Sequence, residues 1–123
     1  MSTERVYTVA GANAELDALR ERLPRLREAR QGLIASSSRI EDAVAADGGG
    51  VAGSDWFRHQ QTLKDEVEYL AERGILLRDP ETGLVDFPAE REGKRILLCW
   101  RLGEGDVAYF HTEHSGFSGR QPL

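Results

Sequence analysis

The sequence from residue 83 to residue 120 is GLVDFPAEREGKRILLCWRLGEGDVAYFHTEHSGFSGR. Apolar and polar residues alternate along much of it, a pattern typical of β-strands that bury one face. Together with the shorter run at 75–78, it predicts an antiparallel sheet of three to four strands, which we place at residues 75–78, 84–87, 95–102 and 107–111. A charged loop at 88–94 and a four-residue turn at 103–106 would join the last three strands.

The turn lengths also predict which side chains share a face, because residues that pair directly across two strands point the same way. A turn at 103–106 places Leu98 opposite His111. The face expected to pack on helices is the more apolar one and carries Val85, Phe87, Ile96, Leu98, Trp100, Tyr109 and His111. The opposite face would carry Asp86, Leu97, Cys99, Arg101, Ala108 and Phe110.

Two helices are expected before the sheet. The first spans residues 9–46, with Thr8 as its N-cap and leucines spaced by three and four at Leu16, Leu19, Leu23 and Leu26. Pro24 removes a backbone donor and predicts a kink near Arg20. A glycine-rich linker at 47–53 leads into a second, antiparallel helix at 54–73, which Gly74 ends. The leucines of the first helix need a cover, which is either the sheet or a second subunit.

The whole chain is therefore predicted to be one α+β domain over residues 1–123. A helical hairpin occupies 9–74, a β-meander 75–111 and a docked C-terminal tail 112–123. The length of 123 residues is sufficient to bury a core without disulfides, and the single cysteine, Cys99, cannot form one internally.

The composition disfavours several classes of partner. The net charge is −5, and the 16 Lys and Arg residues are interleaved with acids, so a nucleic-acid partner is not expected. No apolar run approaches the roughly 20 residues that span a bilayer, and the first residues do not resemble an export signal. We expect a cytoplasmic protein without a membrane partner and without a cofactor.

Several segments together resemble one known family. They are GLVDFP at 83–88, LCWRLGE at 98–104, His111 and GFSGRQP at 116–122. Tyr7, Thr8 and residues 12–14 are similar to the usual opening of the same family, a small group of uncharacterised bacterial proteins classed as a domain of unknown function. The resemblance implies a bacterial origin and a shared architecture but no activity. Members of the family usually have tryptophan before the histidine and an acidic pair after it, whereas this chain has Phe110 and then Thr112, Glu113 and His114.

Metal-ligand chemistry is concentrated in His111, Glu113 and His114, since zinc takes nitrogen, sulfur and carboxylate ligands. Cys99 or Asp86 would complete the set, but the predicted register places both on the opposite face of the sheet from His111. The pattern therefore favours a histidine at the edge of the core over a metal site. Cys99 is expected to be a buried thiol without a base to activate it.

Ligand-binding candidates are His111, Glu113, Arg120, Arg101 and Asp86. Asp86 and Arg101 share a predicted face and favour a structural ion pair, with an anion site using Arg101 and Arg91 as the alternative. In the tail, Phe117 and Arg120 are spaced to dock on the sheet, or Arg120 completes a pocket with His111 and Glu113.

These features favour a non-enzymatic interaction or small-ligand-binding module with an unidentified protein or small-molecule partner. The alternative is a metal-dependent hydrolase centred on His111, Glu113 and His114. Whether the protein is an enzyme is left open. A homodimer through the first helix would cover leucines that the sheet does not reach.

Overall fold

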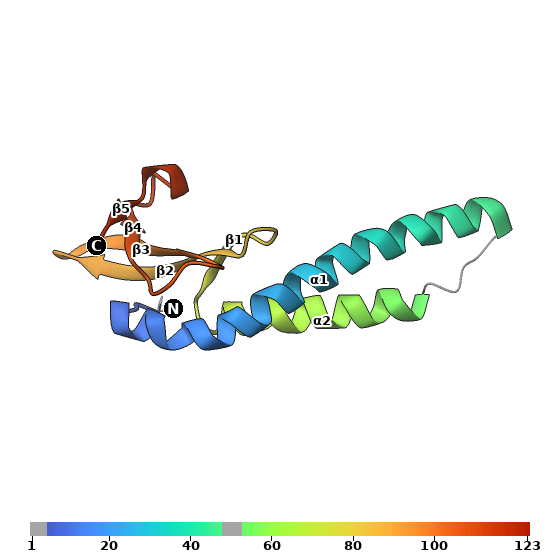
Figure 1. The fold of residues 1–123 in the computed structure, drawn as a ribbon, viewed down its shortest axis with the longest axis horizontal. Helices are drawn as coiled ribbons and strands as arrows, with labels where there is room; N and C mark the ends of the chain where they lie inside the picture. The colour runs from blue at the N-terminus through green and yellow to red at the C-terminus, as the bar shows by residue number, and fades with distance from the viewer. Residues whose placement is uncertain (1–4, 48–52) are drawn as a thin grey trace, which may run out of the picture.

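Two helices and a five-stranded antiparallel sheet form the protein (Figure 1), as seen in a computed structural model that describes residues 5–47 and 53–123. Helix α1 spans Val9–Asp47 and helix α2 spans Gly53–Glu72. Thr8 caps α1, because its Oγ1 accepts the Gly11 N–H at 2.9 Å. The predicted α+β class is confirmed. Residues 48–52, most of the predicted linker, lie outside the described part.

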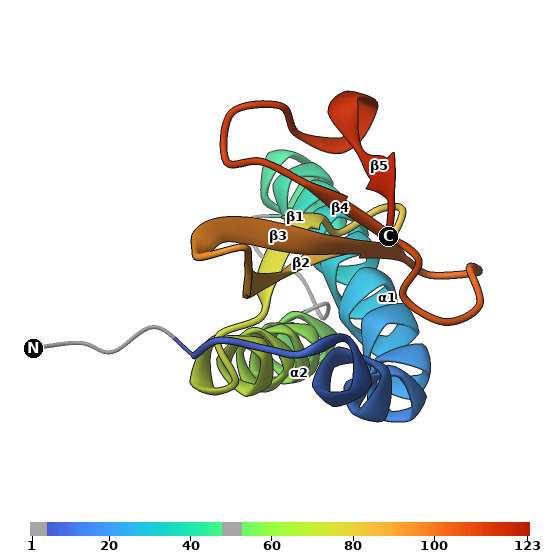
Figure 2. The ribbon, with the colours of Figure 1, turned by 90° about the vertical axis from the view of Figure 1, so that its left-hand side faces the viewer.

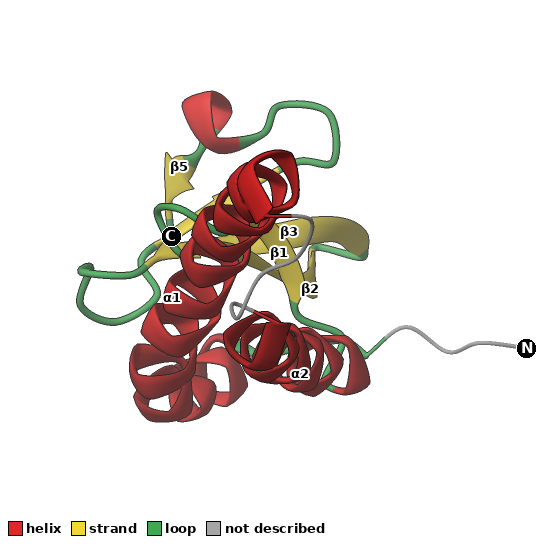
Figure 3. Ribbon diagram, turned by 90° about the vertical axis from the view of Figure 1, so that its right-hand side faces the viewer, coloured by secondary structure: helices red, strands yellow, loops and turns green. Residues whose placement is uncertain are grey.

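Helix α1 is continuous through Pro24 and Gly32. Its axis changes direction between the blue N-terminal part under the sheet and the cyan part beyond it (Figure 1), in the region where the missing N–H of Pro24 loosens the helix. The two helices run antiparallel and diverge toward the ends that residues 48–52 connect (Figures 1 and 3). No helix in the described ranges is both long enough and apolar enough to cross a bilayer.

The sheet has the strand order β1-β2-β3-β4-β5, and every neighbouring pair is antiparallel. The strands are β1 at Leu76–Asp79, β2 at Leu84–Arg91, β3 at Lys94–Arg101, β4 at Tyr109–His111 and β5 at Gln121–Pro122. The fifth strand exceeds the predicted three to four because the tail pairs with β4 after a short 3₁₀ turn, η1, at Phe117–Gly119. The docked tail expected from the sequence is therefore present.

The turn between β2 and β3 is tighter than the predicted loop at 88–94. Arg91 pairs with Lys94, so only Glu92 and Gly93 form the turn, at φ of 54° and 77°. Positive φ at both central residues is the type I′ geometry that matches the twist of a hairpin. Strand β2 runs to Arg91 instead of ending at Phe87, whereas β3 keeps its eight residues and begins one residue earlier, and each pairing moves by two residues. Because side chains alternate with a period of two, the predicted faces of β2 and β3 are unchanged.

The connection between β3 and β4 overturns the rest of the predicted register. Cys99 pairs with Tyr109 and Leu97 pairs with His111, a shift of one residue that turns β4 over. The predicted turn at 103–106 was too short, because Val107 leaves the strand and is buried in the core. The Asn13 side chain holds it there by accepting the Val107 N–H at 2.7 Å. Phe110 consequently faces the helices.

The core lies between the inner face of the sheet and the N-terminal part of α1. In the end-on view of Figure 2 the sheet lies above α2 and the start of α1, with η1 and β5 above the sheet. Leu16, Leu19, Leu23 and Leu26 are at most 2% exposed and belong to the same cluster as the inner-face residues. The leucines are thus covered within one chain. The homodimer through α1 stays a prediction and would have to use other residues of the helix.

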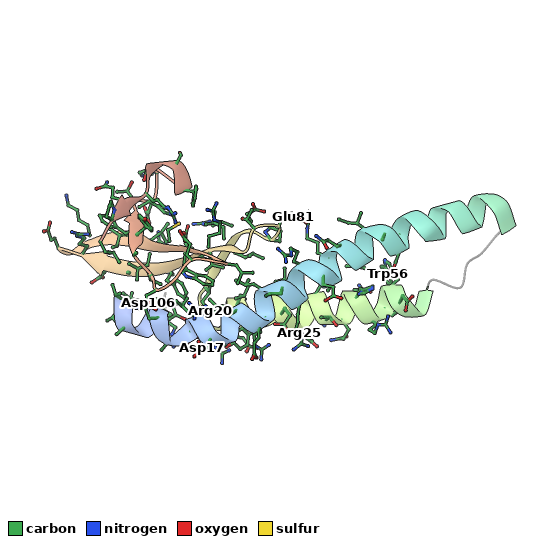
Figure 4. The ribbon with its side chains drawn as sticks, in the orientation of Figure 1. Asp17, Arg20, Arg25, Trp56, Glu81 and Asp106 are labelled. Carbon is green, nitrogen blue, oxygen red and sulfur yellow. The ribbon has the colours of Figure 1, made fainter. Side chains whose placement is uncertain are left out.

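The β1–β2 turn is fixed to α1 by Glu81, which lies above the helix in Figure 4. Its carboxylate pairs with Arg30 and accepts a Gln31 N–H at 3.3 Å, and its carbonyl accepts from Arg27 at 3.4 Å. These contacts anchor the edge strand β1 to α1, and β1 in turn pairs with β2, which carries part of the candidate site.

Candidate functional site

Three side chains of different chemistry converge on the outer face of the sheet, the face turned away from the helices. They are Asp86 on β2, Cys99 on β3 and His111 on β4. Asp86 and Cys99 are direct partners in the ladder, and His111 lies two residues beyond Tyr109, the β4 partner of Cys99. One ligand atom from each lies within 4.8 Å of the others, and the three residues are only 0–3% exposed. We call these three residues the Asp-Cys-His cluster.

His111 and Asp86 face each other at close range. The His111 Nε2 atom lies 3.0 Å from Asp86 Oδ2, and the same oxygen accepts a hydrogen bond from Arg78 Nε at 2.8 Å. On the other side of the ring, His111 Nδ1 lies 2.7 Å from the Thr112 carbonyl oxygen. The second Asp86 oxygen, Oδ1, is buried and has no hydrogen-bond partner among the described residues. An unsatisfied buried carboxylate oxygen is rare enough to require an explanation.

Cys99 is not arranged as a nucleophile. Burial and the nearby Asp86 carboxylate raise the pKa of the Cys99 thiol to about 11, although the Arg120 guanidinium opposes that rise. Both ring nitrogens of His111 already face other groups, so the imidazole is not placed to take the thiol proton. As a metal ligand, the thiol would instead be deprotonated, and its proton would be released to solvent as the ion binds.

A pocket of about 330 Å³ lies beside the cluster. Besides the three cluster residues, Arg78, Leu84, Glu113, Gly116 and Phe117 line it. The C-terminal tail lies over this face of the sheet (Figure 1). The pocket therefore has a polar base on the strands and an aromatic wall from the tail.

Arg120 holds the tail in place. It forms a bidentate pair with Glu104, at 3.1 and 2.7 Å, and its guanidinium stacks on Tyr109 and Phe117, with centroid distances of 4.1 and 4.3 Å. The hydrogen bonds from Arg120 lower the pKa of Glu104, and those same bonds raise the pKa of Arg120. Arg120 lies beside the site and docks the tail, while Phe117 is the tail side chain that reaches the pocket.

Some of the predicted site residues lie at the pocket, and the others lie away from it. Asp86 and His111 are in the cluster, and Glu113 lines the pocket while it pairs with Arg95. His114 is exposed, and Arg101 stacks on Phe117 at 5.1 Å rather than pairing with Asp86, whose cationic partner is Arg78. Arg91 stacks on Phe110 at 4.4 Å, away from Arg101.

Two members of the site were missed from the sequence. Cys99 was separated from His111 because β4 was assigned the wrong face, so this expectation is wrong. Arg78 is the second, although its strand precedes β2 by a four-residue turn and an edge strand pairs with its neighbour. Within the described ranges, the group with metal-ligand geometry is the Asp-Cys-His cluster, without Glu113 and His114.

The fold and the cluster together define an α+β domain with a buried N, O and S donor set on the outer face of its sheet. The chain belongs to a family of uncharacterized conserved proteins (DUF2203), which it matches over residues 5–123. The predicted membership in an uncharacterised family is thus confirmed. Searches of the curated proteins and of the solved structures find no match to the chain.

Proposed function

We propose that the protein is a small-ligand-binding module whose ligand is a divalent transition-metal ion, with Asp86, Cys99 and His111 as the protein ligands. The observation that carries this proposal is the close approach of His111 Nε2 to Asp86 Oδ2, at 3.0 Å in a buried position.

The Thr112 carbonyl can only accept, so His111 Nδ1 carries a proton and donates it. In the neutral ring, Nε2 then presents a lone pair toward a carboxylate oxygen, and two acceptors repel each other. A cation between them removes the repulsion, and that cation is either a proton or a metal ion. A proton satisfies Nε2 and Oδ2 but leaves the Asp86 carboxylate only the weak thiol donor of Cys99, whereas a metal ion beside Cys99 can take Oδ1 as a full ligand.

The donor set fits a zinc-like ion. Imidazole, thiolate and carboxylate are the usual zinc ligands, and tetrahedral coordination places them roughly 3.3–3.8 Å apart. The three ligand atoms lie within 4.8 Å of one another, so the longer separations shorten by at most about 1 Å on binding, while the 3.0 Å gap between Nε2 and Oδ2 opens by about 0.3 Å. Thiolate and carboxylate together neutralise a divalent cation, and the Nδ1 hydrogen bond to a backbone carbonyl is the outer contact that orients a metal-bound histidine.

A metal-dependent hydrolase centred on His111, Glu113 and His114 has less geometric support. Glu113 is 45% exposed and paired with Arg95, and His114 is exposed. Such a site would require His114 to turn toward the buried His111, and Glu113, which lines the same pocket, to leave Arg95. The two ligand sets differ in their dependence on His114, and this difference supplies the test.

The experiment compares two matched histidine variants. Wild-type protein, His111→Gln and His114→Gln are titrated with Zn²⁺ by calorimetry and with Co²⁺ by absorption. We expect one equivalent of metal in the wild type, a thiolate-to-cobalt charge-transfer band in the near ultraviolet, and unchanged behaviour in His114→Gln. His111→Gln should lose at least about 100-fold in affinity, since even outer-shell contacts are worth 10- to 100-fold.

A Cys99→Ser variant identifies the sulfur ligand, because it should abolish the charge-transfer band. The proposal fails if the wild type takes up no metal, or if His114→Gln loses as much affinity as His111→Gln. The second result would favour the hydrolase set instead.

A further inference from the structure

The Asp-Cys-His cluster supplies three protein ligands, and the pocket lies directly beside it. Structural zinc sites are closed by four protein ligands, whereas sites with three keep a position open to water or to an exogenous ligand. Among the described residues, no fourth metal-ligating side chain joins the cluster. The position that completes a tetrahedron is therefore to be filled from the pocket side.

We infer that this open position binds the carboxylate group of a small organic acid, with Arg78 as the residue that recognises it. The inference rests on the proposed metal site and names the class of ligand that such a site would take.

Arg78 has the geometry that this role needs. Its Nε donates to Asp86 Oδ2 at 2.8 Å, which places the guanidinium next to the cluster and on the pocket wall. In the part of the chain that the structure describes, its terminal nitrogens make no hydrogen bond or ion pair. A guanidinium has two parallel donors that match the two oxygens of a carboxylate. One carboxylate oxygen would bind the metal and the other would accept from Arg78.

The remaining pocket lining favours an acid with an apolar body. Leu84 extends from β2 and Phe117 from the tail, and both line the pocket. The ring of Phe117 contacts the guanidinium groups of both Arg101 and Arg120, at 5.1 and 4.3 Å, which hold it beside the pocket. A volume of about 330 Å³ is at the lower end of the range for small-molecule pockets. Benzoate is a suitable probe, and acetate has the same carboxylate without the ring.

The test uses the full chain loaded with Co²⁺ to saturation, because the visible bands of cobalt report its coordination. We expect benzoate to change these bands in a saturable way and to bind more tightly than acetate. The variant Arg78→Gln should weaken benzoate binding at least tenfold. The matched control is Arg58→Gln, since Arg58 lies on α2 and pairs with Asp55, away from the pocket; it should bind benzoate like the wild type.

The outcomes separate the two levels of the proposal. Cobalt bands that do not respond to benzoate overturn the open position while the metal site stands. Equal benzoate affinity in Arg78→Gln and the wild type overturns the role of Arg78. A response to benzoate that appears only in Glu113→Gln would show that Glu113 fills the fourth position, which also overturns the inference. No Co²⁺ uptake at all overturns the proposed function and the inference with it.

Discussion

The β2–β3 hairpin has fully buried residues on both of its faces, but only the outer face buries groups that can be charged. On the inner face, Val85, Phe87, Leu98 and Trp100 are at most 1% exposed and pack on the leucines of α1. On the outer face, Asp86 and Cys99 are at most 2% exposed, yet they lie among titratable groups. Burial alone therefore does not distinguish a core from a site. The distinction lies in the contacts: buried atoms of the inner face contact apolar side chains, whereas those of Asp86 and Cys99 face polar and titratable groups.

The outer face is the less economical arrangement for stability alone. Removing charged groups from water is expensive, and apolar residues of similar size often stabilise a protein as well or better than a buried ion pair. The inner face is filled with such residues. Asp86 also leaves one oxygen unsatisfied, which a purely structural pair would tend to avoid. This contrast is why we place the function on the outer face.

The largest expected effect comes from truncating the inner face. Phe87 is fully buried, opposite Leu98 and in edge-to-face contact with Tyr7 at 5.0 Å. Phe87→Ala should lower the free energy of unfolding by about 3–5 kcal/mol. Cys99→Ala on the outer face should cost only about 1–2 kcal/mol, because the side chain removed is small. Urea unfolding followed by tryptophan fluorescence measures both, and comparable losses would remove the distinction between the faces.

The second effect tests the Asp86–His111 contact in metal-free protein. Asp86→Ala should cost about 3 kcal/mol, since it leaves His111 and Arg78 without their shared partner. Asp86→Asn should cost less, about 2 kcal/mol, because the single amide atom at the Oδ2 position keeps either the His111 contact or the Arg78 contact but not both. Both variants should lose zinc binding. Equal destabilisation would mean that the negative charge itself, rather than the hydrogen-bond geometry, holds the cluster together.

Both faces of β2 and β3 were predictable from the sequence, and the face of β4 was not. Because side chains alternate between the two faces, a register that is wrong by an even number of residues leaves every side chain on its predicted face. The β2–β3 register, set by the turn at Glu92 and Gly93, differs from the prediction by two residues, so both faces were predicted correctly. The one-residue error after β3 reversed His111. Its cause was the contact of Val107 with Asn13, 94 positions away in the sequence, which no local turn rule contains. The cluster was missed for that reason.

The third effect is the pH dependence of metal binding, which sharpens the assignment of Cys99 to the outer-face site. With a pKa of about 11, the thiol is protonated at neutral pH in metal-free protein, and a metal-bound sulfur is deprotonated. Each ion bound must therefore release that proton. The zinc association constant should rise about tenfold per pH unit, or about 100-fold from pH 6 to pH 8.

Competition with a chromophoric chelator at pH 6, 7 and 8 measures this slope. Cys99→Ser is the control, and its slope should be smaller by about one proton. Identical slopes in the two proteins would exclude sulfur from the coordination sphere.

The fourth effect concerns the tail that covers the outer face and has no counterpart on the inner one. The Arg120–Glu104 pair is partly buried, with side-chain exposures of 16% and 22%. Arg120→Met should lower the free energy of unfolding by about 1–2 kcal/mol at pH 7, as for a hydrogen bond between charged groups. Arg101→Met, which removes the other cation stacked on Phe117, should cost less.

The same pair carries a defined pH dependence. Because Arg120 lowers the folded-state pKa of Glu104, the stabilisation is complete above the ordinary carboxyl range and is lost as the pH falls through that lowered value. The difference between the wild type and Arg120→Met should therefore shrink in acid. Unfolding curves at pH 7 and pH 3 test this, and a difference that persists unchanged at pH 3 would mean that stacking on Tyr109 and Phe117, rather than the charge pair, docks the tail.

The smallest effect tests the turn that gives the hairpin its two faces. Glu92 adopts a φ of 54° and Gly93 a φ of 77°. Residues other than glycine, asparagine and aspartate disfavour a positive φ. Glu92→Asn creates the Asn-Gly pair that a type I′ turn prefers and should raise the free energy of unfolding by about 0.5–1 kcal/mol. Gly93→Ala should lower it by about 1 kcal/mol; a Cβ there would meet no neighbouring atom within 4 Å, so only the backbone conformation is at issue. Chemical denaturation measures both changes. The turn sets the register of β2 against β3, which includes the Asp86–Cys99 pair. Because Glu92→Asn keeps the same turn geometry, it should leave the zinc affinity unchanged. A change in that affinity would show that this turn alone does not hold the register.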